Sequence, residues 1–272
     1  MSDANISDDQ PLPPSPSYSD TTKPAEPTGP TMSTGETLTG IFFEPGRTFE
    51  ALRQRPKFLV AGIIIIVLIV AFNFILLQRM GYENLIRSAI ENSPQAANMS
   101  PEQMDRAVGF YTGPIGKAIA YGAPVVVLAV IFAAGAALYL LGAMLMGKKL
   151  SYKQALSVWV YSSFPPVLVG TLLNFVLLFL KSRDDIDPQE IMQRGSLVHA
   201  NLGFIVSMTE HPILGALLNS LDLLAFYGLF LAALGLRKVA RLSSGSAWGI
   251  VLSLWLLNVL YHMGKAALTG TP

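Results

Sequence analysis

Residues 58–77 read FLVAGIIIIVLIVAFNFILL, a run that contains no charged side chain. A helix of about 20 apolar residues crosses the hydrocarbon core of a bilayer, which is about 30 Å thick. Four more apolar stretches follow Phe58–Leu77, at Ile119–Met146, Ala155–Leu180, Ile213–Leu236 and Ser246–Ala267. The sequence therefore predicts an all-α, polytopic membrane helix bundle with about five transmembrane helices.

The composition agrees with a membrane protein and excludes several other classes. Only 14% of the 272 residues are charged, against about 25% in soluble domains, and the mean hydropathy is +0.47. A net charge of +1 gives no global positive field for a nucleic-acid partner. The chain has no cysteine, which excludes disulfides, thiolate metal sites and cysteine nucleophiles. We expect no cofactor and no metal.

The chain divides into three parts. Residues 1–38 are rich in Pro, Ser, Thr and Gly, and such a segment cannot bury enough apolar surface to order itself; we expect a disordered cytosolic tail. In residues 39–57, Phe49 and Leu52 share one helical face beside charged neighbours, which predicts a short amphipathic helix lying in the membrane interface. Residues 58–268 form the five-span membrane domain.

Two long polar loops are predicted to carry short helices. Ser100-Pro101-Glu102-Gln103 combines an N-cap serine with a first-turn proline and a third-position glutamine, which predicts a helix through Met104 and Val108. Residues 82–92 are amphipathic, and Asp187-Pro188-Gln189-Glu190 repeats the capping pattern in the second loop.

Pro165 and Pro166 lie within the third apolar stretch. Proline removes a backbone donor and disfavours helix at the residue before it, so we expect this span to be kinked or broken. A broken membrane helix can mark a transport site. We favour a packing kink, because no matching break is apparent in another stretch.

The charges of the short loops predict the orientation. Residues 147–154 hold Lys148, Lys149 and Lys153 without an acid, and residues 237–245 likewise contain only basic charges. Short basic loops stay in the cytoplasm. Five spans then place the N-terminus in the cytoplasm and the C-terminus outside.

Few polar side chains remain in the apolar stretches, and with this orientation they fall in one layer in the outer half of the membrane: Asn73, Asn174, Asp222, Asn258 and His262. An ionisable group in the membrane is costly and is usually turned inward and paired. The layer is interpreted either as a hydrogen-bonded clamp between the third, fourth and fifth spans or as a proton or ligand site. The clamp is favoured, because a transporter would be expected to have more ionisable side chains in the membrane than one carboxylate and one imidazole.

Enzyme signatures are absent from the sequence. It contains no His-Glu-x-x-His helix, no Gly-x-Ser-x-Gly elbow and no phosphate-binding Gly-Lys-Ser/Thr. Small residues at positions 133–137 and 142–143 allow close helix packing. We interpret them as internal contacts and leave a homo-oligomer open.

Several strings, taken in order, resemble the Yip family, whose members carry the Yip-one domain. They are Ile41-x-x-x-Pro45-x-x-x-Phe49 with Pro56, Tyr161-Ser-Ser-Phe-Pro165, and Leu221-Asp222-Leu223 leading to Leu234-Gly235-Leu236-Arg237-Lys238. The resemblance covers about residues 39–268 and implies an integral membrane protein with a cytosolic N-terminus and no catalytic residues.

Eukaryotic members of that family are linked to Rab-type GTPases and to traffic between the endoplasmic reticulum and the Golgi. The helical loops and acid-rich tail here look more like prokaryotic members, so the GTPase link is not carried over, and we expect a bacterial inner (plasma) membrane. The expected role is a non-enzymatic scaffold or adaptor in the lipid bilayer, whose tail and basic loops meet a membrane or cytosolic protein. The alternative is a small transporter or channel that uses the outer polar layer.

Overall fold

The computed structural model describes residues 31–91, 93, 96–182, 185–186, 196–198, 200–207 and 210–269. Most of these residues are α-helical, and the isolated bridge between Asn201 and Asp222 is the extended pairing found among them. Residues 1–30 of the predicted tail and the predicted cap at 187–190 lie outside the described residues.

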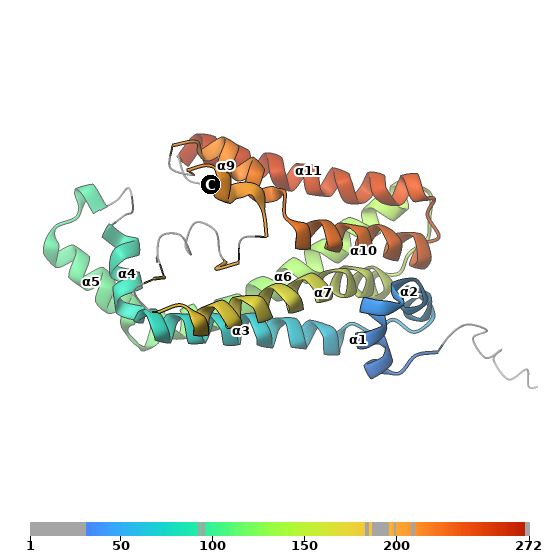
Figure 1. Ribbon diagram of the computed structural model, residues 1–272, viewed down its shortest axis with the longest axis horizontal. Helices are drawn as coiled ribbons and strands as arrows, with labels where there is room; N and C mark the ends of the chain where they lie inside the picture. Colours follow the sequence, from blue (N-terminus) through green and yellow to red (C-terminus); the bar gives the residue numbers. More distant parts are fainter. Residues whose placement is uncertain are drawn as a thin grey trace, which may run out of the picture.

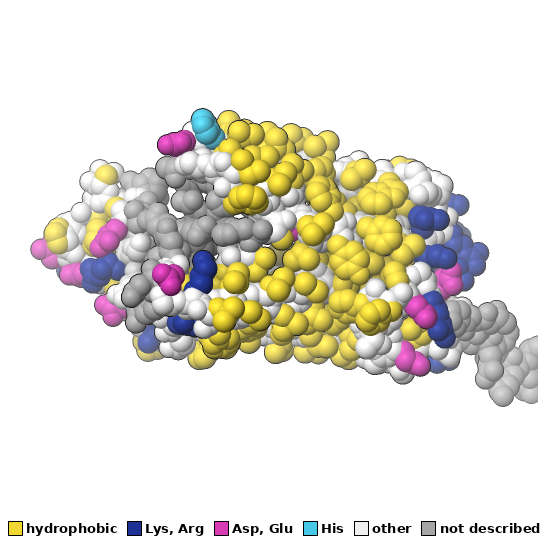
Figure 2. Space-filling model, in the orientation of Figure 1, with side chains coloured by type: hydrophobic (Ala, Val, Ile, Leu, Met, Phe, Trp, Pro, Cys, Tyr) yellow, Lys and Arg dark blue, Asp and Glu magenta, His cyan; other side chains and the backbone are white. Residues whose placement is uncertain are grey.

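Four helices in the described part of the chain are long and apolar enough to cross a bilayer. They are α3 (Leu59–Met80), α6 (Pro114–Leu145), α7 (Tyr152–Leu180) and α11 (Ser244–Thr269). All four run roughly along the longest axis of the molecule (Figure 1). Figure 2 shows hydrophobic side chains around the middle of the molecule and charged side chains gathered at its two ends. This distribution matches an apolar belt in lipid with both ends in water.

A helical hairpin precedes the first span. It consists of α1 (Thr34–Phe43) and α2 (Pro45–Gln54), and we name the end of the bundle where it lies the hairpin end (Figure 1). Ser33 and Glu36 form a capping box at the start of α1, and the Ser33 backbone N–H that donates to Glu36 lowers the pKa of that carboxyl. The helix thus begins inside the segment that we assigned to the tail.

The fourth apolar stretch is two helices, where the sequence predicted one. Helix α9 (Pro212–Ser220) lies at the end opposite the hairpin, and α10 (Leu223–Val239) runs to the hairpin end (Figure 1). At about 1.5 Å per residue they rise about 13 and 25 Å, so each is shorter than a hydrocarbon core of about 30 Å. The fourth crossing therefore needs both pieces.

Helix α7 runs unbroken through Pro165 and Pro166, so the expectation of a broken third span was wrong, while a local kink stays a prediction. Proline inside a helix costs about 3 kcal/mol or more. Here α7 is the central helix, packed against α3, α6 and α10, and Phe164 and Pro165 are buried. Packing against three helices offsets the local preference of the prolines to end the helix.

The opposite end, which we name the loop end, carries the two predicted loop helices α4 (Tyr82–Glu91) and α5 (Pro101–Thr112). The capping box at Ser100 and Gln103 is confirmed. The Arg79 guanidinium at the end of α3 donates to the Leu178 and Lys181 carbonyls at the end of α7. Because these carbonyls have no partner within their helix, Arg79 both caps α7 and joins it to α3.

Candidate functional site

The break in the fourth crossing is built around Asp222. Its carboxylate accepts the Ala225 backbone N–H at 2.8 Å, which makes Asp222 the N-cap of α10. An acidic N-cap satisfies an orphan donor and interacts favourably with the positive end of the helix dipole. The chain therefore starts a new helix at Asp222, within the predicted apolar stretch Ile213–Leu236.

A segment without α-helix lies against this break. We name residues 196–205 the inserted segment; all of it except position 199 is described. Its Ala200 carbonyl accepts the Leu223 N–H at 3.0 Å, and Asn201 pairs antiparallel with Asp222. Beyond this pairing, the Asn201 side chain accepts the Gly203 N–H and caps the short turn η2 (Leu202–Ile205).

Asn174 of α7 holds the other side of the inserted segment. Its amide oxygen accepts the Leu197 N–H at 2.7 Å, the Val198 N–H at 3.1 Å and the Ser196 hydroxyl at 3.0 Å. Its amide nitrogen donates to the Gly170 carbonyl of its own helix. Irregular backbone at membrane depth is tolerated where protein groups satisfy it. Asn174 and the pairing at Asp222 supply those groups.

The remaining members of the predicted polar layer lie apart from this arrangement. Asn73 donates to the Ile69 carbonyl of its own helix, Asn258 is exposed, and His262 contacts the Tyr261 ring. The structure therefore links Asn174 and Asp222 through the inserted segment, which connects the third and fourth crossings. Among the described hydrogen bonds, none extends the link to Asn258 or His262 on α11.

Sequence reasoning did not single out Asn219, Ser196 or Asn201. The amide oxygen of Asn219, three residues before Asp222, is buried without a hydrogen-bond partner among the described residues. A signal for the break was present in Asn219-Ser220-Leu221-Asp222, since Asn, Ser and Asp favour caps and turns. For the inserted segment, no periodic pattern marks its return toward α7.

A second feature is the socket that receives the hairpin. The Phe49 ring of α2 is buried against Val158 of α7 and Gly235 of α10. A Cβ atom built on Gly235 would lie 2.8 Å from the Val158 side chain and 2.9 Å from the Phe49 ring. The missing side chain at Gly235 is therefore the space that Phe49 fills.

Polar contacts join the hairpin to the rest of this end. The Tyr161 hydroxyl donates to the Thr37 hydroxyl at 3.0 Å in a buried position, and Lys238 forms an ion pair with Glu50 at 2.6 Å. Their apolar partners Ile41, Phe49 and Leu52 are fully buried. The position of 39–57 in the membrane interface stays a prediction, and its helix α2 packs against α7 and α10.

These features define a polytopic α-helical membrane protein whose helical hairpin packs into one end of the bundle. The family model of the Yip1 domain matches residues 39–264, and the chain belongs to that family. It is similar to membrane protein YknW of Bacillus subtilis (strain 168), with 25% identity over 228 residues that cover 83% of this chain and 88% of the relative. No solved structure shows a significant match.

Proposed function

We propose that the protein is a non-enzymatic membrane adaptor whose hairpin end faces the cytoplasm and presents residues 1–30 to a protein partner. The observation that carries the proposal is the seating of Phe49 in the socket between Val158 and Gly235. A buried anchor of this kind fixes α2, and with it the helical hairpin, relative to the bundle. The chain position that follows residues 1–30 is therefore fixed on the bundle.

The chemistry of the hairpin end supports this role. The α6–α7 loop carries Lys148 and Lys149, both exposed, and α10 ends with Arg237 and Lys238. Basic loops of this kind favour the cytoplasmic side. The residues before α1 are rich in proline, and extended proline-rich chains are bound by aromatic grooves of partner domains.

The test compares the full chain with two variants, one lacking residues 1–30 and one in which they are replaced by a Gly/Ser segment of equal length. We expect both variants to insert and to unfold at the temperature of the full chain, because the socket is intact. Both should lose a protein that co-purifies with the full chain in mild detergent. Retention of that protein by both variants would overturn the adaptor proposal.

The break at Asp222 supports a second candidate, a transporter. Discontinuous helices in transporters often form binding sites, and next to the break the amide oxygen of Asn219 is buried without a hydrogen-bond partner among the described residues. Reconstitution into liposomes tests this candidate. A transporter that uses Asp222 should lose proton-dependent flux in Asp222→Asn while its unfolding temperature stays near that of the unmodified chain. Absence of flux in the unmodified chain would exclude the transporter and favour the adaptor.

A further inference from the structure

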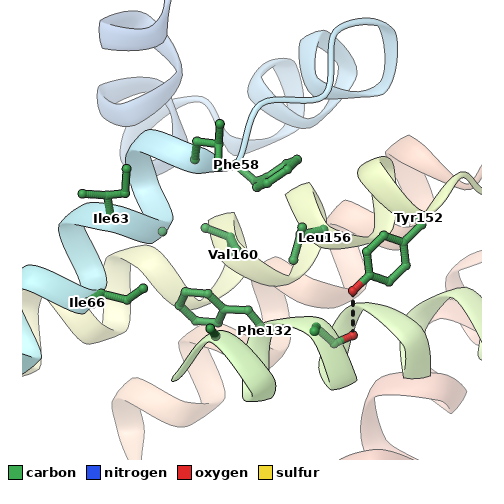
Figure 3. A pocket seen from close by; sticks show the side chains of 11 residues that line it. Phe58, Ile63, Ile66, Phe132, Tyr152, Leu156 and Val160 are labelled. Atoms are coloured by element: carbon green, nitrogen blue, oxygen red, sulfur yellow. Dashed lines mark hydrogen bonds between the residues drawn. The ribbon is translucent and has the colours of Figure 1, made fainter. Parts of the chain in front are cut away.

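A groove opens toward the surrounding lipid where α3, α6 and α7 meet, near the hairpin end (Figure 3). It has a volume of about 200 Å³. Its walls come from Phe58, Ile63 and Ile66 of α3, Phe132 of α6, and Leu156 and Val160 of α7 (Figure 3). Every one of these side chains is apolar, so the groove suits a hydrocarbon chain.

Small residues give the groove its depth. Gly62 lies at its floor, and a Cβ atom built there would be 3.6 Å from the Phe132 ring and 3.9 Å from Val160. Ala129 and Ala133 line it from α6. Tyr152 spans the gap between α7 and α6, because its hydroxyl donates to the Ala133 carbonyl at 3.1 Å (Figure 3). This bond closes one side of the groove, while Leu59 and Ile63 leave another open to lipid.

The polar boundary of the groove is positively charged. Phe58 directly follows Arg55-Pro56-Lys57, and Tyr152 directly precedes Lys153. Neither residues 51–60 nor residues 147–160 contain an acid, and the acid that acts on Lys57 is Glu36 of α1. Lys57 donates to the Met32 carbonyl at 2.7 Å, and an ammonium group has two further donors. Arg55 and Lys153 are exposed. A cationic rim beside an apolar groove is complementary to a lipid with an anionic headgroup.

We propose that this groove is a binding site for one anionic phospholipid. An acyl chain lies between α3, α6 and α7, and the phosphate of the headgroup lies among Arg55, Lys57 and Lys153. From Phe58 to Ile66 the groove follows about 12 Å of α3, which accommodates part of one chain. The site is separate from the break at Asp222 and from the socket of Phe49. It would give the protein a preference among the lipids that surround it.

The experiment is native mass spectrometry of the full chain in mild detergent, titrated with phosphatidylglycerol or with phosphatidylcholine of identical acyl chains. We expect the first phosphatidylglycerol to bind at least about tenfold more tightly, a difference of about 1.4 kcal/mol. Lys57→Gln with Lys153→Gln should reduce that preference by about fivefold or more, since each lysine near an anionic lipid adds attraction. The control is the double variant Arg106→Gln with Lys117→Gln, which removes equal charge from α5 and the start of α6. It should leave the preference for phosphatidylglycerol unchanged.

The chain-binding part is tested by Ala129→Phe, which places a ring in the groove from an exposed position. It should weaken the first binding event for both lipids, whereas Ala134→Phe, exposed on α6 outside the groove, should leave it unchanged. Unfolding temperatures verify that all variants fold. Equal binding of the two lipids by the unmodified chain would overturn the proposal. So would undiminished binding in Ala129→Phe, or a dimer that covers the groove and excludes lipid.

Discussion

The carboxamide oxygen of Asn174 accepts two backbone N–H groups and one hydroxyl from the inserted segment. Leu197, one of those donors, is buried in the apolar cluster of Phe72, Leu76 and Leu178. A buried donor left without a partner costs about 1–3 kcal/mol. At the residue scale, the stability of the loop end therefore depends on one uncharged side chain that sits within an apolar helix.

Asn174→Ala should lower the free energy of unfolding by about 1–3 kcal/mol, because the Leu197 N–H group loses its acceptor. The Val198 N–H group keeps the Ser196 hydroxyl as an acceptor. Unfolding in detergent measures the loss, and hydrogen exchange should speed up most at the Leu197 amide. Asn73→Ala is the matched control. Its side chain bonds only to its own helix, and we expect a change within about 0.5 kcal/mol. Equal effects of the two substitutions would contradict the role of Asn174.

Asp222 makes a second prediction at this scale. Asparagine is as good an N-cap as aspartate, whereas removing the cap costs about 1 kcal/mol. Asp222→Asn should therefore unfold at nearly the same temperature as the unmodified chain, and Asp222→Leu should unfold at a lower temperature. Thermal unfolding in detergent distinguishes them. If the amide proved as damaging as leucine, the carboxylate would have a role beyond capping α10.

At the scale of elements, the hairpin and α10 illustrate how a glycine creates a binding surface within the fold. Phe49 enters the space above Gly235, and the Glu50–Lys238 ion pair lies beside it. Both charged side chains are more than a third exposed, so this pair contributes little. Burial of Ile41, Phe49 and Leu52 stabilises the hairpin more, by about 1.5–3 kcal/mol for each fully buried side chain.

Gly235→Ala should displace Phe49 and lower the free energy of unfolding by about 1–3 kcal/mol, the usual cost of overpacking. It should also make Arg53, which follows the socket contacts of α2, more accessible to trypsin. Gly249→Ala is the control, since nothing lies within 4 Å of its added Cβ atom. Alanine there should be neutral or stabilising by up to about 1 kcal/mol. Unchanged cleavage in Gly235→Ala would contradict the socket.

The elements that were predicted correctly are encoded by residues close together in the chain. Helix α5 begins where Ser100, Pro101 and Gln103 place it, and α3 is a plain apolar run. The break in the fourth crossing was missed because the apolar length of the stretch outweighed the capping preference of Asp222. The inserted segment was missed because its hydrogen bonds go to Asn174, more than 20 residues earlier in the chain. No local pattern encodes a partner at that distance.

At the scale of the whole molecule, the hairpin and the end of α11 lie at opposite ends of the bundle (Figure 1). Four described helices are long and apolar enough to cross the belt. We expect the α9–α10 pair to form a fifth crossing, and an odd number of crossings agrees with this arrangement. Charge distribution then decides which end faces the cytoplasm.

Single-cysteine labelling should find positions 148 and 241 on the cytoplasmic side and position 98 outside. The expectation follows from the basic loops that hold Lys148 and Arg241 and from the position of Asn98 between α4 and α5. The chain has no cysteine of its own, so each introduced thiol reports alone. Labelling of position 98 only after the cytoplasm is opened would reverse the orientation.

The socket also fixes when the hairpin can be completed during synthesis. Phe49 and Gly235 are separated by more than 180 residues, and a ribosome adds about 5–20 residues per second. About 10–40 s therefore pass between the synthesis of α2 and that of Gly235, which completes the socket. Until α10 has been made, the membrane holds chains with an unseated hairpin and an exposed Phe49. A protein that recognises only the seated hairpin would therefore bind only chains in which α10 has been made.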